Sequence, residues 1–219
     1  MPDIQISQKL ISFILFLPMF FLSITIHEYA HAFSASKLGD DTAQKTGRLT
    51  FNPIKHADLI GTVIMPLASF ASGFALIGWA KPVPVNRNNF KNRLRDDAIV
   101  SFAGPLSNFI LAIIFFAGFL IAFNLNFGLR EYIVNIFWYG VFFNIFLFAF
   151  NLLPIPPLDG SHILFDLYPN KITAALLNLG LYGSIILLVL IYSPLWGYFM
   201  NLVNLILRIF LGVAGLKNV

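Results

Sequence analysis

Two histidines four residues apart flank a glutamate in the stretch HEYAH at residues 27–31. On a helix, residues i and i+4 lie on the same face, so the imidazoles of His27 and His31 can share one zinc ion. Glu28 then lies beside the metal rather than on it, where its carboxylate can take a proton from a water activated by the metal. The spacing therefore predicts a zinc-dependent hydrolase with Glu28 as its general base.

A catalytic zinc ion needs a third protein ligand and one open position. The best candidate is Asp159, which follows an uncharged run in the stretch FNLLPIPPLDGSH at residues 150–162. Three prolines stiffen the approach to this carboxylate, and Gly160 allows a sharp turn next to it. Taken alone, the residues favour a plain helix N-cap ahead of SHILFDL just as strongly, so both interpretations of Asp159 stay open at this point.

The other two histidines have simpler interpretations. His56 lies in a charged loop between Lys55 and Asp58, which indicates a structural hydrogen-bonding residue. His162 follows Asp159 by three residues, so we expect it to lie next to the metal ligands rather than on the metal.

Uncharged runs mark the elements that must position these side chains. A helix needs about 20 apolar residues to cross a bilayer, and the last run is long enough for nearly two crossings, divided at Pro194. We also expect two amides inside such runs, Asn108 and Asn144, to bridge helices. The uncharged runs cover residues 10–26, 59–80, 98–129, 132–158 and 172–207.

The composition indicates an integral membrane protein. Hydrophobic residues make up 58% of the 219 residues and charged residues only 11%, whereas a soluble domain is about a quarter charged. Ionisable groups inside membrane spans are costly and usually functional, which strengthens the zinc interpretation of HEYAH. The chain has no cysteine and a net charge of only +4. We therefore expect no disulfide, no thiolate metal site and no nucleic-acid partner. The lipid bilayer is the expected surrounding, and no prediction of oligomeric state follows.

We expect a single membrane domain over residues 1–219, with the motifs in a core of about residues 10–165 and a helical pair at about 172–216. The fold class is all-α and multi-pass, a helical bundle with a re-entrant segment. Short β pieces are expected at GRLTF (47–51) and KPVPV (81–85).

Three motifs together resemble a known family. HEYAH (27–31), AGPLSN (103–108) and NLLPIPPLDG (151–160) occur in the order and spacing of the site-2 protease family of intramembrane zinc metalloproteases. FNPIKHADLIGT (51–62) and GWAKPVPVN (78–86) look like the compact bacterial branch of that family, here without a PDZ or CBS domain.

The resemblance implies a set of roles. His27, His31 and Asp159 would be the ligands of one zinc ion per chain, Glu28 the catalytic base, and Asn151 a residue near the scissile carbonyl. It also implies a bundle with a three-helix core, and an endopeptidase that cuts peptide bonds within or near the transmembrane helices of membrane protein substrates.

A shared metal constrains the threading of the chain. HEYAH ends the first uncharged run and Asp159 follows the fourth, so both of these ends must reach the same membrane face. Residues 59–80 are then too few for two crossings at 1.5 Å per residue. We therefore expect this segment to dip into the membrane and return, or to lie against the bundle.

Lysine and arginine positions support this threading independently. With the dip, only Lys9 and Arg130 of the 14 lysine and arginine residues lie on the face opposite the metal. Because these residues gather on the cytoplasmic side of membranes, we expect a protein of the cell (inner) membrane, with its active site near the cytoplasmic face.

Other functions compete with proteolysis. A membrane prenyl protease would favour a glutamate ligand on a later helix, and the only other glutamate is Glu131. A membrane desaturase needs more histidines than the four present. A metal transporter or a non-proteolytic metal-binding membrane protein is the main alternative, although such a protein has no need for Glu28.

Overall fold

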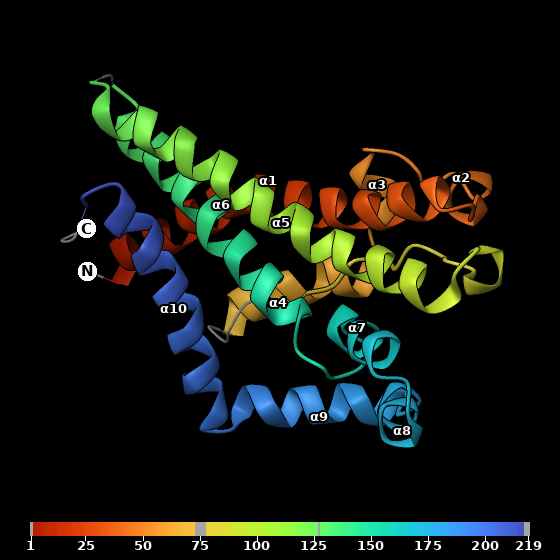
Figure 1. Cartoon of the computed structure of the whole chain (residues 1–219). Helices are drawn as coiled ribbons and strands as arrows, with labels where there is room; N and C mark the ends of the chain where they lie inside the picture. Colours follow the sequence, from red (N-terminus) through yellow and green to blue (C-terminus); the bar gives the residue numbers. More distant parts are fainter. Residues whose placement is uncertain (1, 73–77, 127, 217–219) are drawn as a thin grey trace.

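The computed structural model describes residues 2–72, 78–126 and 128–216, which form helices joined by irregular loops (Figure 1). The predicted all-α class is confirmed, because no strand occurs within these ranges. The helices, in chain order, are α1 (Pro2–Lys37), α2 (Thr42–Lys45), α3 (Pro53–His56), η1 (Leu59–Ile64), α4 (Met65–Ser72), η2 (Arg87–Asn89), α5 (Arg93–Asn124), α6 (Arg130–Asn151), α7 (Asp159–Leu167), α8 (Lys171–Leu177), α9 (Leu181–Tyr192) and α10 (Leu195–Val213).

The predicted β pieces at 47–51 and 81–85 are wrong. Residues 47–51 form turns and bends, and residues 81–85 form an irregular segment without a paired strand. The physical reason for the second segment is its composition, since Pro82 and Pro84 carry no N–H group to donate to a ladder. Apolar residues alternate there without the backbone donors that a strand requires.

Four of the described helices are long and apolar enough to cross a membrane: Lys9–Lys37 of α1, α5, α6 and α10. The last uncharged run is divided where Pro194 predicted, because α9 ends at Tyr192 and α10 begins at Leu195. The pair α8 and α9 together also passes the length and apolarity test, with a bend of 83° between the two helices.

Helices α1, α5 and α6 pack together as the core of the bundle (Figure 1). Helix α10 packs against α5 and α6. Two glycine–phenylalanine contacts bring α5 and α6 together. A Cβ on Gly118 would overlap the ring of Phe137, and a Cβ on Gly140 would lie 2.7 Å from the ring of Phe115. Small residues of this kind let transmembrane helices approach closely where lipid provides no hydrophobic driving force.

Buried amides join the three core helices. The side chains of Ser23, Asn108 and Asn144 come from α1, α5 and α6 and are fully buried. Asn108 Nδ2 donates to Asn144 Oδ1 at 2.9 Å, and Asn144 Nδ2 donates to Ser23 Oγ at 2.8 Å. The two amides therefore bridge helices, as the sequence predicts.

The described chain on the two sides of residues 73–77 comes together again between α3 and α5. Trp79 N–H donates to the Gly61 carbonyl at 3.0 Å, and the Thr62 hydroxyl donates to the Trp79 carbonyl at 2.8 Å. Two residues later, Lys81 N–H donates to the His56 carbonyl at 2.9 Å. The segment that begins at η1 thus ends beside its own start, although residues 73–77 lie outside the described part of the chain.

Helix α7 brings the last predicted ligand to the bundle. The loop after α6 ends at Leu158, and α7 begins at Asp159 and packs against α5. Leu158 occupies the N-cap position and Asp159 is the first helical residue, so Asp159 is not the N-cap of this helix. Gly160 has ordinary backbone angles, but a Cβ there would collide with the carbonyls of Leu152 and Leu153. Close packing of α7 on the preceding loop, rather than a sharp turn, requires this glycine.

Candidate metal centre

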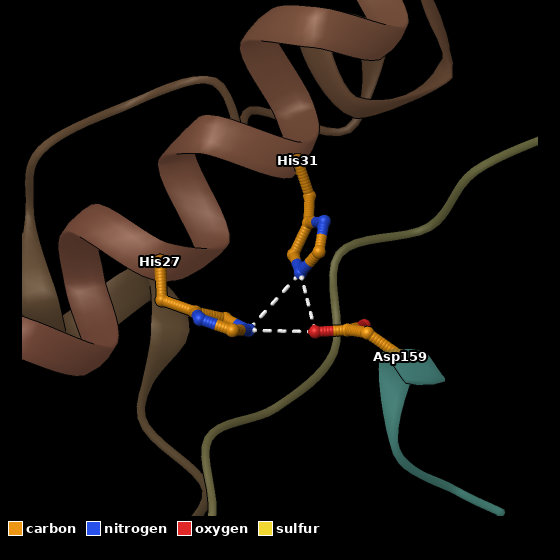
Figure 2. Close-up of side chains that lie close together, drawn as sticks. All are labelled: His27, His31 and Asp159. Carbon is orange, nitrogen blue, oxygen red and sulfur yellow. Dashed lines mark hydrogen bonds and ion pairs between the residues drawn. The ribbon is translucent and has the colours of Figure 1, made fainter. Parts of the chain in front are cut away.

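Three side chains from two distant parts of the chain converge on one point (Figure 2). His27 and His31 extend from α1 toward the start of α7, where Asp159 points back at them. The His27 Nε2 and His31 Nε2 atoms are 3.0 Å apart. Asp159 Oδ2 lies 3.2 Å from His27 Nε2 and 3.4 Å from His31 Nε2. The structure thus brings together the three residues that the sequence predicts as ligands.

The other nitrogen of each imidazole faces an acceptor. His27 Nδ1 lies 2.6 Å from Asn108 Oδ1, and His31 Nδ1 lies 2.7 Å from the Val100 carbonyl oxygen. The orientation of the Asn108 amide is fixed by its Nδ2 group, which donates to Asn144 Oδ1. Each Nδ1 atom must therefore carry the hydrogen, which leaves both Nε2 atoms as bare lone pairs.

The converging lone pairs fit a metal cation. Two Nε2 lone pairs and a carboxylate oxygen repel one another at these distances unless a positive charge lies among them. Zinc–nitrogen bonds of about 2.0–2.1 Å in a tetrahedron place ligand atoms about 3.3 Å apart, close to the three observed separations. Asp159 Oδ2 is also buried without a hydrogen-bond partner. Two nitrogens and one oxygen leave a fourth tetrahedral position free.

Helix α5 covers the imidazoles closely at Gly104. A Cβ at this position would lie 2.7 Å from His27 Cε1 and closer still to His31 Nε2. Only a glycine lets the backbone of α5 pass so close to the two imidazole rings. This contact explains why a glycine occupies position 104 in the stretch AGPLSN.

Glu28 contacts the irregular segment that follows the returning chain. Its Oε2 atom accepts a hydrogen bond of 2.9 Å from the backbone N–H of Val83. Its negative charge also acts on His31. The carboxylate therefore lies near the metal ligands without belonging to the group of three, as expected for a general base.

A group of charged side chains holds α7 against α5 and the loop before it. Arg87 of η2 pairs with Asp97 of α5 and also contacts Nδ1 of His162 on α7. Asp97 Oδ2 lies 3.7 Å from the same His162 nitrogen. Asp166, one turn further along α7, faces Asp97. These four residues, called the α7 brace below, fasten the helix whose first residue is Asp159.

The remaining predicted residues do not belong to the ligand group found among the described residues. His56 is fully buried, and its Nε2 atom lies 2.8 Å from the Thr50 carbonyl, in keeping with a structural role. His162 lies on α7 itself, three residues after Asp159, and belongs to the α7 brace rather than to the ligand group. Asn151 donates from Nδ2 to the Leu147 carbonyl of its own helix at 3.0 Å. Its role near the scissile carbonyl stays a prediction.

An apolar cavity of about 550 Å³ lies elsewhere in the bundle. Its lining includes Phe16 of α1, Trp138 and Phe146 of α6, and Trp196 of α10. Phe16 is about 16 Å along α1 from His27 at 1.5 Å per residue. This cavity lies outside the ligand group, and its lining contains no Asp, Glu, His, Lys or Arg.

Three hydrogen bonds of the ligands and of Glu28 were not predicted from the sequence. Asn108 was expected to bridge helices, whereas the same amide also receives the Nδ1 hydrogen of His27. The Val100 carbonyl and the Val83 N–H are backbone groups, so no residue type signals their roles. For Asn108, a signal existed, because it is a polar residue in an uncharged run and belongs to AGPLSN.

Known proteins that are similar in sequence to this chain are named as zinc metalloproteases, in agreement with a metal centre at His27, His31 and Asp159. A family model described as peptidase family M50 matches residues 15–129 and 119–191. The chain is 45% identical over 183 residues to "Putative zinc metalloprotease YwhC" of Bacillus subtilis, covering 81% of this chain and 80% of that protein. It is 32% identical over 186 residues to "Putative zinc metalloprotease Rip2" of Mycolicibacterium smegmatis, covering 83% and 68% of the two chains. No solved structure gives a significant match. These matches confirm the resemblance to the site-2 protease family, and the chain belongs to peptidase family M50.

Proposed function

We propose that this protein is a zinc-dependent endopeptidase that cuts membrane protein substrates within or near their transmembrane helices. The observation that carries the proposal is the convergence of His27 Nε2, His31 Nε2 and Asp159 Oδ2 within 3.4 Å of one another. The peptidase family and the names of the relatives support zinc as the metal and peptide hydrolysis as the reaction. One zinc ion per chain is the stoichiometry that this ligand group implies.

The ligands lie well inside an apolar helix, which supports an intramembrane site. The candidate span of α1 ends at Lys37. Measured along the helix, His31 lies about 9 Å and His27 about 15 Å before this lysine. The ligands are thus several ångströms deeper than the charged loops. The gathering of lysine and arginine in those loops supports a location near the cytoplasmic face of the cell membrane.

The returning segment supports the predicted threading. Because residues 79 and 81 bond to residues 61 and 56, the stretch between them need not cross the bilayer. We propose that η1 and α4 dip into the membrane and come back on the same side. The first turns of this dip are stabilised by Asp58, whose carboxylate accepts hydrogen bonds from the N–H groups of Ile60 and Gly61.

Each side chain then has a defined task. Zinc bound here would supply a Lewis acid that polarises the scissile carbonyl and makes a water molecule acidic enough to deprotonate near neutral pH. Glu28 takes the proton of that water and returns it to the leaving amine. Asn108 and the Val100 carbonyl hold the two imidazoles in the tautomer that presents Nε2. The α7 brace holds the helix that presents Asp159.

Comparative proteomics of membrane peptides tests the proposal. Cells or proteoliposomes that contain the wild-type protein should release fragments of single-span proteins that cells with Glu28→Gln do not release. Glu28→Gln should still bind zinc, because Glu28 is not among the ligands. The matched control is Glu131→Gln, which changes the exposed second glutamate at the start of α6 and should release the same fragments as the wild type.

The metal-transporter alternative predicts a different result. A transporter would move metal across vesicles and would not depend on the Glu28 carboxylate for any cleavage. Equal fragment patterns for the wild type and Glu28→Gln would remove the peptidase proposal. The peptidase family match and the position of Glu28 beside the ligands favour hydrolysis.

A further inference from the structure

The proposed catalytic base has a backbone partner. Oε2 of Glu28 accepts a hydrogen bond of 2.9 Å from the N–H of Val83, a residue 55 positions later in the chain. Within the described residues, this is the hydrogen bond that the Glu28 carboxylate receives. It engages one carboxylate oxygen and leaves Oε1 available to a water molecule.

The Val83 N–H is held in place by anchors that do not involve Glu28. Two residues upstream, the Lys81 N–H donates to the His56 carbonyl, and the Lys81 carbonyl accepts from Arg48 Nη2 at 2.5 Å. Downstream, Asn86 N–H donates to Oδ2 of Asp40 at 2.7 Å, and Asp40 is fully buried. The segment is therefore fixed on both sides of Val83.

The sequence of the segment isolates a single donor. Pro82 and Pro84 flank Val83 and carry no N–H, so Val83 has the only backbone donor in residues 82–84. The two pyrrolidine rings also fix their own φ angles and keep the backbone extended. The segment is therefore rigid and has one N–H donor, which points at the Glu28 carboxylate.

We propose that the Val83 N–H is a positioning group for Glu28, holding one carboxylate oxygen so that the other meets the attacking water. This inference rests on the proposed peptidase function and deepens it by naming what orients the base. A glutamate has three rotatable bonds, and a general base works only within hydrogen-bond reach of the proton that it takes. Fixing one oxygen to a rigid backbone restricts the carboxylate to the productive arrangement.

Two variants at one position separate the N–H from the side chain. Val83→Pro removes the N–H and suits a backbone that already lies between two prolines, whereas Val83→Ala shortens the side chain and retains the N–H. The reporter is a single-span protein whose fragment is released by the wild type and not by Glu28→Gln. We expect Val83→Pro to lower kcat about tenfold or more with KM within about twofold, because a positioned general base contributes about 10²–10⁴-fold. Val83→Ala should stay within about twofold of the wild type.

Zinc content provides a readout that is independent of turnover. Val83→Pro and Val83→Ala should both bind one zinc ion per chain, since Val83 contacts the base and not the ligands. Amide hydrogen exchange provides a second one. The Val83 amide of the wild type should be protected, and Glu28→Ala should accelerate its exchange while the Lys81 amide, which bonds to His56, keeps its protection.

The outcomes are distinct. Equal kcat for Val83→Pro and Val83→Ala, or unchanged exchange at Val83 in Glu28→Ala, would overturn the inference while leaving the proposed function in place. A raised KM with unchanged kcat in Val83→Pro would also overturn it, because that pattern indicates substrate contact rather than orientation of the base. Loss of zinc in Val83→Pro would show a structural role and overturn it as well. Failure of the wild type to release any reporter fragment that depends on Glu28 would overturn the proposed function itself, and this inference with it.

Discussion

Oδ1 of Asn108 on α5 lies 2.6 Å from Nδ1 of His27 on α1, and the same amide donates to Asn144 on α6. One buried side chain therefore joins all three core helices and also faces a proposed metal ligand. We expect helix packing and metal affinity to be coupled through this residue.

Asn108→Leu removes that coupling and keeps the number and branching of the side-chain heavy atoms. We expect zinc affinity to fall about 10–100-fold, the usual effect of losing a hydrogen-bond partner of a ligating histidine. Competition with a fluorescent zinc chelator measures the affinity. Asn124→Leu is the matched control, because Asn124 is exposed at the far end of α5 and, among the described residues, its side chain bonds to the Leu120 carbonyl of its own helix. Similar zinc affinity in the two variants would contradict the role of Asn108.

Asp159→Asn tests the third ligand. The amide is a much weaker metal ligand than a carboxylate, so we expect the purified variant to retain less than about a tenth of the wild-type zinc after dialysis against a mild chelator. Metal analysis by mass spectrometry measures the content. Asp41→Asn, at an exposed ion pair with Lys45, should keep full zinc. Full zinc in Asp159→Asn would place the third ligand elsewhere.

Gly104→Ala tests the close passage of α5. The added methyl group would overlap the His31 ring, so we expect the imidazoles to shift, with a loss of zinc and a stability cost of about 1–3 kcal/mol from overpacking. Gly212→Ala is the matched control, because a Cβ there meets no atom within 4 Å. Zinc content and thermal unfolding in detergent measure both effects, and equal behaviour of the two variants would refute the prediction.

The α7 brace predicts a pH dependence of stability. Burial, and then the hydrogen bond and negative charge of Asp97, raise the pKa of Asp166 to about 8, although Arg87 and Arg93 oppose the shift. A folded-state pKa above the unfolded value of 3.8 means that the folded protein holds the proton more tightly. This stabilisation is complete below about pH 4 and is lost as the pH rises through 8. His162 also faces Asp97 and contributes positive charge when protonated.

Asp166→Asn removes this titration. The free energy of unfolding of the wild type should fall relative to that of Asp166→Asn between pH 5 and about 8, and the difference should level off above that range. Chemical unfolding in detergent across this range measures the difference, with chelator present so that zinc binding does not contribute. A difference that stays constant with pH would show that Asp166 does not hold the proton.

The ligand group could be predicted because it depends on residue types that stand out in an apolar chain. His27 and His31 are spaced by one helical turn, and Asp159 is an acid at the end of an uncharged run. The expected turn-back of residues 59–80 was inferred by requiring His27, His31 and Asp159 to share one metal, and the bonds of residues 79 and 81 to residues 61 and 56 agree with it. These inferences use the chemistry of the side chains and the number of residues in each uncharged run, and both can be taken directly from the sequence.

The remaining contacts depend on backbone groups and on distance in space. The Val83 N–H and the Val100 carbonyl leave no trace in residue type, since every residue except proline carries both groups. The expected β pieces were wrong because the apolar alternation at 81–85 coincides with prolines that exclude a ladder. Gly160 was assigned to a turn, whereas the carbonyls of Leu152 and Leu153 exclude any side chain there.

The ligand group joins the first helix to one that the ribosome makes much later. At about 5–20 residues per second, Asp159 emerges roughly 6–25 s after His31 during synthesis. Until then, the imidazoles of α1 have no carboxylate to complete the metal site. A nascent or prematurely terminated chain without Asp159 therefore lacks the third ligand of the proposed metal site, so that site can form only after most of the core has been made.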